Sequence, residues 1–375
     1  MATTGDLRER GSAMKFGQLH LFENPMGRPD KEIIEEQFDI MARAEEFGFD
    51  SIWPAEHHFS EYGYCASPAV TLAALASRTQ RIRLGTGVVV LPLNHPVRVA
   101  EDFAILDLLS GGRVDLGVGR GYQPHEFVGY GVDQERSRDM FRESVEIIQK
   151  AWTEERFDYD GEFYQFHDLS VRPKPLQKPH PPIWMASLSP ETFQICGQYG
   201  FNLMCAPVFG FDVNRGAAQI EEYRVALREH GRDPADHQIA GLIMTYVAET
   251  TQEALADFQE AVMWYFRTFA KYIAPPKGKP AVKTYEMYTA ARDWLQTLDW
   301  DNVVQGGAVI CGSPDQVAER IAQIHELCGV NQYLAWTRIG GLAHQKVLRS
   351  MELMRDKVMP QVRHLGEKAA ATTAR

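Results

Sequence analysis

The stretch that decides the fold is residues 81–121, RIRLGTGVVVLPLNHPVRVAEDFAILDLLSGGRVDLGVGRG. It starts with a long β-strand pattern at 81–93, whose GVVVLP segment is apolar almost throughout, as is typical of a strand buried on both faces. A helical pattern follows at 95–112 and ends in two glycines, and a second strand pattern covers 113–121. A helix between two strands indicates parallel pairing, because the connecting helix covers the sheet as it crosses back.

The same alternation extends over most of the chain. Eight strand patterns lie at 15–22, 50–54, 81–93, 113–121, 182–186, 201–207, 238–250 and 331–340. Helical patterns lie at 30–48, 67–79, 95–112, 133–152, 189–200, 212–231, 251–273, 313–329 and 342–362. Eight strand–helix units predict a TIM-type (β/α)8 barrel. A doubly wound sheet is the alternative, but the first strand is not followed by the G-x-G-x-x-G turn that usually marks one.

Two segments interrupt the alternation. Residues 156–181, rich in aromatic residues and prolines, predict an inserted hairpin or loop, and residues 274–307 predict a second insertion. We expect one barrel domain over 14–363, with a flexible leader at 1–13 and a flexible tail at 364–375.

Composition excludes several classes of function. The formal net charge is −11, from 50 acidic and 39 basic residues, which argues against a nucleic-acid partner. No apolar run reaches the ~18 residues that span a membrane, and the first residues lack the apolar core of a secretion signal. The five cysteines are scattered without a C-x-x-C pair, so we expect a reduced, cytoplasmic protein and no cysteine zinc site.

Polar residues after the fourth and fifth predicted strands indicate an anion site. Arg120 stands between two glycines at a strand end, and a guanidinium fork suits a phosphate, although a structural ion pair is an equal alternative. Ser187 and Ser189 precede Pro190 at a predicted helix start, where amides and hydroxyls can hold an anion, or can form a simple N-cap. Together these features favour one phosphate monoester, since no P-loop motif exists.

Glu56, His57 and His58 follow the second predicted strand. Neighbouring side chains on extended backbone point to opposite sides, so His57 and His58 are poorly placed to bind one metal, and we predict no metal site. We expect one of the two to face a pocket near its working pKa, with an ordinary loop histidine as the alternative.

Four blocks of sequence resemble the luciferase-like flavin monooxygenase family, and within it the alpha subunits of bacterial luciferase. They are EHHFSEYG (56–63), IRLGTGVVVLPLNHPVRVAEDFAILDLLSGGR (82–113), GVGRGYQPHEFVGYGVDQERSR (117–138) and PIWMASLSPET (182–192). The resemblance implies a TIM-type barrel that binds reduced FMN at the carboxyl ends of the strands. It also implies O2 chemistry through a C4a-(hydro)peroxyflavin on a small organic substrate, and a separate flavin reductase that supplies the reduced FMN.

The resemblance also implies roles for individual residues. His57 matches the catalytic histidine, Arg120 and Arg138 the phosphate-binding arginines, and Ser189 and Thr192 the hydroxyls that hold the same phosphate. Further residues of the predicted cofactor site are Tyr122, whose backbone would meet the flavin, Gly87 and Val88, between which the family carries a cis peptide, and Glu56, Ala186 and Ser187.

Two departures concern light emission. Gly119 replaces a reactive cysteine beside the phosphate arginine, and Leu188 replaces an acidic residue, so emission of light and a long-chain aldehyde substrate are both in doubt. A deazaflavin-dependent hydride-transfer enzyme of the same fold is one alternative, and a non-catalytic flavin-binding protein is another.

The family is commonly dimeric, and the small apolar residues of 67–79 suit a homodimer interface, although they equally suit core packing. Within the second insertion, Tyr285, Tyr288 and Trp294 make a candidate lid, with an ordinary surface excursion as the alternative.

Overall fold

The computed structural model describes residues 13–273 and 286–366. Within them, eight parallel strands close into a barrel, as predicted. Their order around the barrel is β1 (Lys15–His20), β2 (Ser51–Pro54), β3 (Arg83–Gly85) with β4 (Val89–Val90), β5 (Val114–Gly119), β8 (Ile183–Ser187), β9 (Asn202–Cys205), β10 (Ile239–Val247) and β12 (Gln332–Trp336). Pairing of β1 with β12, Lys15 opposite Gln332, closes the ring.

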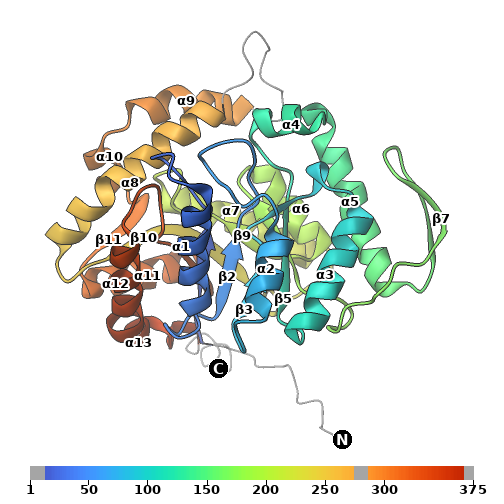
Figure 1. Cartoon of the computed structure of the whole chain (residues 1–375), viewed down its shortest axis with the longest axis horizontal. Helices are drawn as coiled ribbons and strands as arrows, with labels where there is room; N and C mark the ends of the chain where they lie inside the picture. The colour runs from blue at the N-terminus through green and yellow to red at the C-terminus, as the bar shows by residue number, and fades with distance from the viewer. Residues whose placement is uncertain (1–12, 274–285, 367–375) are drawn as a thin grey trace, which may run out of the picture.

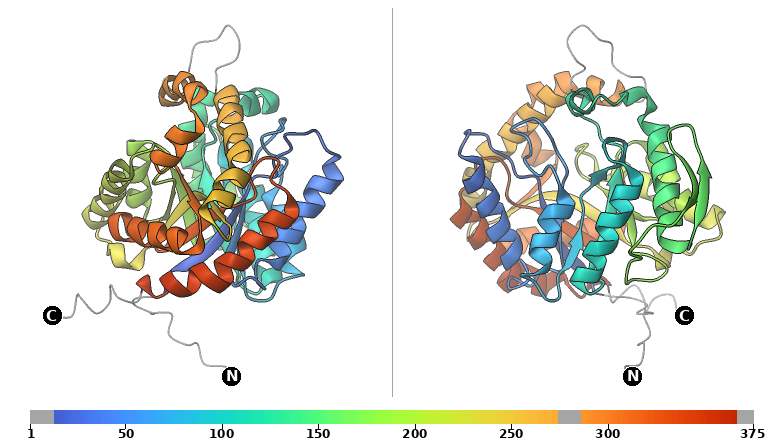
Figure 2. Two further views of the ribbon diagram at one scale, coloured as in Figure 1. Left: turned by 90° about the vertical axis from the view of Figure 1, so that its left-hand side faces the viewer. Right: turned by 45° about the vertical axis from the view of Figure 1, so that its right-hand side comes forward.

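The helices cover the outside of the strands (Figures 1 and 2). They are α1 (Asp30–Arg43), α2 (Pro68–Ala76), α3 (Pro96–Ser110), α4 (Pro124–Tyr130), α5 (Ser137–Thr153), α6 (Pro190–Tyr199), α7 (Val213–Glu229), α8 (Thr251–Tyr272), α9 (Glu286–Thr297), α10 (Trp300–Gln305), α11 (Pro314–Cys328), α12 (His344–Leu353) and α13 (Met359–Val362). A π-helical segment at Met354–Val358 joins the last two, so the helix predicted at 342–362 is nearly continuous. No helix among the described residues is long and apolar enough to cross a membrane.

The long strand predicted at 81–93 is wrong in detail. It is divided into β3 and β4, with a cis peptide between Gly87 and Val88, and it ends in a 3-10 turn at Leu91–Leu93. Between the two short strands the Thr86 hydroxyl donates to the Gly117 carbonyl (2.7 Å) and accepts from the Gly117 amide (2.9 Å). Hydrogen bonds from the Thr86 side chain thus replace the regular backbone hydrogen bonds between the strands at Gly117.

A short strand was missed by the sequence pattern. β11 (Val309–Gly312) pairs with the carboxyl half of β10, Met244 opposite Val309, in addition to the closed ring. Four residues are too few to show a period, and they directly follow the predicted insertion.

The two predicted insertions differ from each other in structure. The first forms the antiparallel hairpin of β6 (Phe157–Asp160) and β7 (Gln165–Leu169). The described part of the second is helical, with α9 and α10, rather than an irregular loop. Figure 1 shows α9 and α4 at the same end of the molecule.

Aromatic residues fill the barrel interior. Trp53 of β2 and Trp184 of β8 meet edge to face, with ring centroids 5.3 Å apart. Gly85 makes room for this pair, because a Cβ there would lie 2.3 Å from the Trp53 ring. The interior is therefore packed with side chains, and the space that remains lies beyond the carboxyl ends of the strands.

Candidate active site

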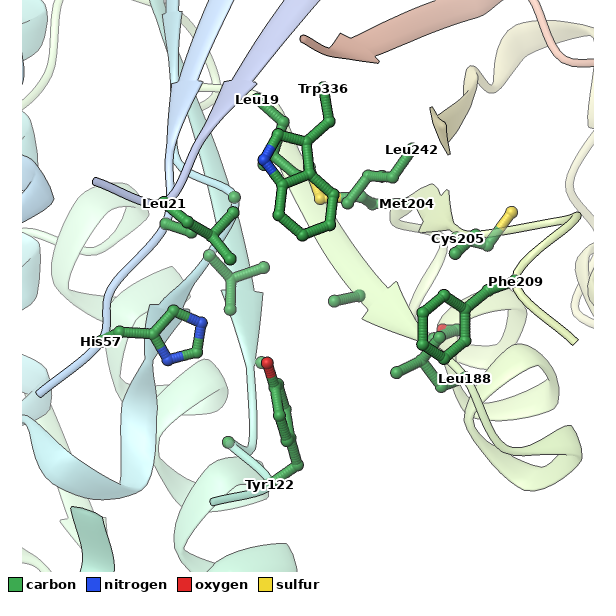
Figure 3. A pocket seen from close by; sticks show the side chains of 18 of the residues that line it. Leu19, Leu21, His57, Tyr122, Leu188, Met204, Cys205, Phe209, Leu242 and Trp336 are labelled. Carbon is green, nitrogen blue, oxygen red and sulfur yellow. The ribbon is translucent and has the colours of Figure 1, made fainter. Parts of the chain in front are cut away.

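A cavity opens at the carboxyl ends of the strands, where the predicted site residues were expected. The described residues that line it are Leu19, Leu21, Ala55, Glu56, His57, Tyr62, Gly87, Val88, Val90, Gly119, Arg120, Gly121, Tyr122, Glu126, Met185, Ala186, Ser187, Leu188, Ser189, Thr192, Met204, Cys205, Ala206, Val208, Phe209, Leu242, Met244, Tyr265, Phe269, Ala308 and Trp336. Of the residues predicted for the site, Arg138 alone does not line the cavity. Figure 3 shows His57 and Tyr122 across the space from Leu188 and Phe209.

His57 is the histidine that faces the cavity (Figure 3). Its Nδ1 lies 3.0 Å from Oε1 of Glu126, and its ring meets the Tyr62 ring edge to face at 4.8 Å. His58 points away from the cavity, with Nε2 2.9 Å from Oε1 of Glu56 and Nδ1 3.2 Å from the Tyr130 hydroxyl. The two neighbouring imidazoles therefore have separate environments, as their spacing predicted.

Glu126 is a site residue that sequence reasoning missed. It is buried in the first turn of α4, and its Oε1 also accepts a hydrogen bond from the His58 amide at 2.9 Å. Burial acts to raise the pKa of Glu126, but the charge of His57 and the hydrogen bonds from His57 and the His58 amide outweigh it and lower that pKa. An ionised carboxylate only accepts hydrogen bonds, so Nδ1 of His57 is the donor in this contact, and Nε2 is the ring nitrogen that Glu126 does not engage.

Glu56 organises the backbone beside the cavity. One of its oxygens accepts a hydrogen bond from the Val90 amide at 2.8 Å, and the other accepts one from the Asn94 side chain at 2.9 Å. Its own amide donates to the Val88 carbonyl at 3.1 Å. The buried carboxylate thus ties the loop after β2 to the segment that contains Gly87 and Val88.

One end of the cavity gathers groups that suit an anion. Ser189 stands at the N-cap of α6, yet its hydroxyl makes no capping hydrogen bond to the first turn, which corrects the simple N-cap alternative. The Ser189 hydroxyl lies 3.3 Å from Oγ1 of Thr192 instead, and the Ser187 hydroxyl donates to the Thr192 carbonyl at 3.1 Å. Arg120 lines the same cavity from the end of β5. A helix start, hydroxyls and a guanidinium group together fit a phosphate.

Arg138 lies at the edge of this end. Its Nη2 forms an ion pair of 2.6 Å with Oε2 of Glu191, in the first turn of α6 one residue before Thr192. The side chain is 41% exposed, as expected at a rim rather than in a wall. The predicted phosphate arginine is therefore adjacent to the anion site but is held by a carboxylate.

Aromatic side chains form part of the remaining wall, together with aliphatic and sulfur-containing ones. Those that line the cavity are Tyr62, Tyr122, Phe209, Tyr265, Phe269 and Trp336. The Tyr62 hydroxyl lies 2.8 Å from that of Tyr122 and donates to that of Tyr265 at 3.0 Å. Burial raises the pKa of Tyr62 and of Tyr122 well above the ordinary value, so both remain protonated phenols.

A buried glutamate, Glu23, fixes the position of Trp336 in the wall. Trp336 donates from its indole nitrogen to Oε1 of Glu23 at 3.2 Å. Burial raises the pKa of Glu23 to about 8, although the nearby charge of Arg338 acts to lower it. Glu23 and Arg338 do not line the cavity and lie behind its wall, whereas Trp336 is part of that wall.

The candidate lid is not supported by the residues that the structure describes. Trp294 of α9 packs against Phe211 with ring centroids 4.8 Å apart and does not line the cavity. Tyr285 and the side chain of Tyr288 lie outside the described residues. Within the described ranges, no group of three or more histidine, cysteine or acidic side chains could hold a metal ion.

Comparison with known proteins identifies related chains. Residues 14–331 match the family model of the luciferase-like monooxygenases. The alkanal monooxygenase alpha chain of Photorhabdus laumondii is 32% identical over 359 residues, covering 92% of this chain and 97% of its own length. The oxygenase component of the flavin-dependent trigonelline monooxygenase of Acinetobacter baylyi is 27% identical over 344 residues, covering 88% of this chain and 90% of its own.

Solved structures agree with the fold. The monooxygenase RslO1 from Streptomyces bottropensis superimposes with a TM-score of 0.80 at 28% identity, over 92% of this chain and 99% of its own. The oxygenating constituent of 3,6-diketocamphane monooxygenase from Pseudomonas putida, solved with FMN, gives 0.77 at 23% identity over 93% and 99%. An F420-dependent secondary alcohol dehydrogenase gives 0.72 at 20% identity over 94% and 99%. The last two show a common fold.

Proposed function

Because the chain belongs to the luciferase-like monooxygenase family, we propose that it is an FMN-dependent monooxygenase. It takes reduced FMN from a separate flavin reductase and uses O2 to place one oxygen atom on a small organic substrate. The separate reductase follows the trigonelline enzyme, whose name designates an oxygenase component.

The observation that carries the proposal is the cavity with two chemically different parts. Its anion-binding end has Arg120, Ser189 and the start of α6, with Arg138 at the rim. Its other part has a histidine backed by a buried carboxylate within an aromatic wall. These groups match a ligand with a phosphate at one end and a flat ring system at the other.

The residues present fit FMN. Arg120, Arg138, Ser189 and Thr192 would hold its phosphate, and Gly87, Val88, Ala186 and Tyr122 would adjoin its ring. When bound in the reduced form, FMN supplies the electrons that activate O2. The chain supplies the binding groups and an apolar cavity that limits access of water to the reacting atoms.

His57 is the group that we propose for proton movement. The Glu126 carboxylate fixes the imidazole through Nδ1 and stabilises the positive charge that the ring acquires when Nε2 takes a proton. His57 can therefore accept a proton from a substrate and return it later, while its orientation stays constant.

A deazaflavin enzyme is the second candidate, since an F420-dependent dehydrogenase shares the fold. Titrating the protein with FMN and with F420, while following the fluorescence of each cofactor, separates the two. We expect FMN to bind more tightly, and preferential binding of F420 would favour the second candidate.

The proposal is tested by stopped-flow absorbance. The protein is loaded with reduced FMN and mixed with oxygenated buffer, and the return of oxidised FMN is followed. We expect slower return than for free reduced FMN, because the cavity shields the flavin from water. Identical time courses would contradict the proposal.

A pair of variants tests the assigned histidine in the same assay. We expect His57→Ala to change the time course by roughly 10²-fold, in the range of general acid–base effects. His167→Ala is the control, because His167 is 94% exposed on the β6–β7 hairpin. An unchanged His57→Ala time course would remove His57 from the mechanism.

A further inference from the structure

We propose that the substrate of this cavity is a phenol, a planar aromatic molecule whose hydroxyl group is deprotonated by His57. The inference rests on the proposed function and specifies its substrate class. Three features of the cavity lead to it: its rings, its charges and its hydroxyl groups.

The aromatic side chains of the cavity wall favour a flat aromatic ligand. Tyr62 and Tyr265 have ring centroids 5.6 Å apart, and Tyr265 meets Trp336 edge to face at 4.5 Å. Phe269 lies 5.7 Å from the Tyr122 ring and 5.4 Å from Phe209. Contributions from α8, from β12 and from the loops after β2, β5 and β9 thus converge, and an aromatic ligand gains stacked or edge-to-face contacts from them.

The charges disfavour an anionic substrate. Among the described residues that line the cavity, Arg120 is the only lysine or arginine, and the proposed phosphate site uses it. A carboxylate substrate in this aromatic wall would lack a partner, and burial of an unpaired charge is costly. A neutral phenol avoids that cost, because its proton passes to His57 and the resulting charges stay adjacent.

The tyrosine hydroxyl groups can recognise the hydroxyl oxygen of the substrate. Tyr62, Tyr122 and Tyr265 already form a connected set of phenols beside the His57 ring, which lies 4.8 Å from Tyr62 and 5.8 Å from Tyr122. Phenols that remain protonated can donate hydrogen bonds to an oxygen that becomes negative. The oxygen of a bound phenol would join this set at the point where its proton is removed.

The chemical step is a proton transfer followed by oxygenation. The phenol O–H bond breaks, an N–H bond forms at Nε2 of His57, and the electron pair stays on the phenolate oxygen. The extra electron density at the ring carbons ortho and para to this oxygen favours attack on an electrophilic oxygen. Overall, a phenol, O2 and reduced FMN give a dihydroxyarene, water and oxidised FMN.

Several other titratable groups surround His57, and the experiment must distinguish their effects from the effect of His57 itself. They are Glu126 on α4, Glu56 and His58 beside it in the chain, His125 on α4, and the hydroxyls of Tyr62, Tyr122 and Tyr265. Glu126 alone among the carboxylates contacts the His57 ring through a hydrogen bond. Glu126→Gln is therefore the most direct probe of how strongly His57 acts as a base.

The experiment uses 4-nitrophenol, whose ionisation changes its visible absorbance, and the protein without flavin. We expect the bound phenol to ionise at a pH lower by roughly one unit than in buffer, a tenfold gain in phenolate. Glu126→Gln and His57→Gln should retain binding, measured by tryptophan fluorescence, and lose this shift. Tyr159→Phe is the control, because Tyr159 lies on the β6–β7 hairpin, does not line the cavity, and donates its hydroxyl hydrogen to Glu146 of α5.

Two ligands complete the test. We expect 4-nitroanisole, which lacks the ionisable hydroxyl, to bind at least about tenfold more weakly. Equal binding of the two, absence of an ionisation shift in the unmodified protein, or displacement of 4-nitrophenol by a lower concentration of n-decanal would each overturn the phenol assignment.

The outcome is independent of the flavin assay. An ionisation shift together with unaltered oxidation of reduced FMN supports the phenol site and overturns the monooxygenase. Slowed flavin oxidation without an ionisation shift overturns only the substrate class.

Discussion

Arg138 and Glu191 form an ion pair next to the proposed phosphate site, and both side chains are partly exposed, 41% and 49%. An exposed pair of this kind stabilises a protein by only about 0–1 kcal/mol. A phosphate that approaches Arg138 must therefore displace a weakly held carboxylate. We therefore propose that Glu191 competes with the FMN phosphate for Arg138, which would ease the exchange of flavin that the proposed function requires.

We expect Glu191→Gln to bind FMN about two- to fivefold more tightly, because the competing charge is gone. Quenching of FMN fluorescence at low ionic strength measures the effect. Glu154→Gln is the control, since Glu154 pairs with Lys150 at the far end of α5. Weaker binding by Glu191→Gln would show that the carboxylate positions Arg138 instead of competing with the phosphate.

Single residues differ in how far the sequence could reveal them. His57 and Arg120 stand in short motifs at strand ends, so their position in a barrel follows from local pattern. Glu126 could not be assigned in this way, because it lies on the seven-residue helix α4, too short for a clear period. Gln123-Pro124, with Gly131 after the last turn, was the available signal for that helix.

β3 and β5 come unusually close at Gly117. A Cβ on Gly117 would lie 1.8 Å from the Thr86 carbonyl oxygen, and the Thr86 hydroxyl binds both the amide and the carbonyl of Gly117. Backbone cannot move aside as the end of a side chain can. The crossing of these two strands therefore requires glycine.

Gly117→Ala is expected to lower the free energy of unfolding by at least about 1–3 kcal/mol, the usual cost of overpacking. Denaturant titration followed by circular dichroism measures it. Gly210→Ala is the matched control, because a Cβ there meets nothing within 4 Å. Equal stability of the two variants would mean that the strands separate without cost.

The order of strands and helices was predictable, whereas their interruptions were not. The helical segment predicted at 251–273 corresponds to α8 almost residue for residue, and the strand predicted at 238–250 contains β10 but extends three residues beyond its end. The break between β3 and β4 depends on Thr86 and Gly117, which are far apart in the sequence. The aromatic side chains of the wall likewise come from five places in the chain, namely three loops, α8 and β12, and no local pattern predicts such convergence.

The barrel is closed by the pairing of β1 with β12 and by a buried polar contact between the ends of these strands. Glu23 follows β1 and accepts a hydrogen bond from Trp336 at the end of β12, so the contact joins the two ends of the ring. Burial raises the pKa of Glu23 from 4.5 to about 8. Between these values the folded protein holds a proton that the unfolded chain has released, so this group makes stability fall as pH rises.

We expect Glu23→Gln to remove that dependence. The free energy of unfolding of the unmodified protein should fall relative to the variant between about pH 4.5 and pH 8, by at most about 1.4 kcal/mol per pH unit, and the difference should be constant above this range. Denaturant titrations at several pH values measure it. Parallel pH profiles would show that Glu23 is ionised in the folded protein throughout.

The association of two copies stays a prediction. Val70 on α2 and Leu109 on α3 are 70% and 67% exposed, and α2 covers most of the segment 67–79 that was expected to suit a homodimer interface. Sedimentation at several protein concentrations tests it, and a monomer at all of them would contradict the prediction.

The central claim is that one cavity holds FMN with its phosphate at the start of α6 and its ring beside His57. A crystal structure of the protein soaked with FMN tests it most directly. The account predicts the phosphate within hydrogen-bond distance of Arg120, Ser189 and Thr192, and the ring against Gly87 and Val88. A phosphate bound away from α6, or a ring remote from His57, would contradict it.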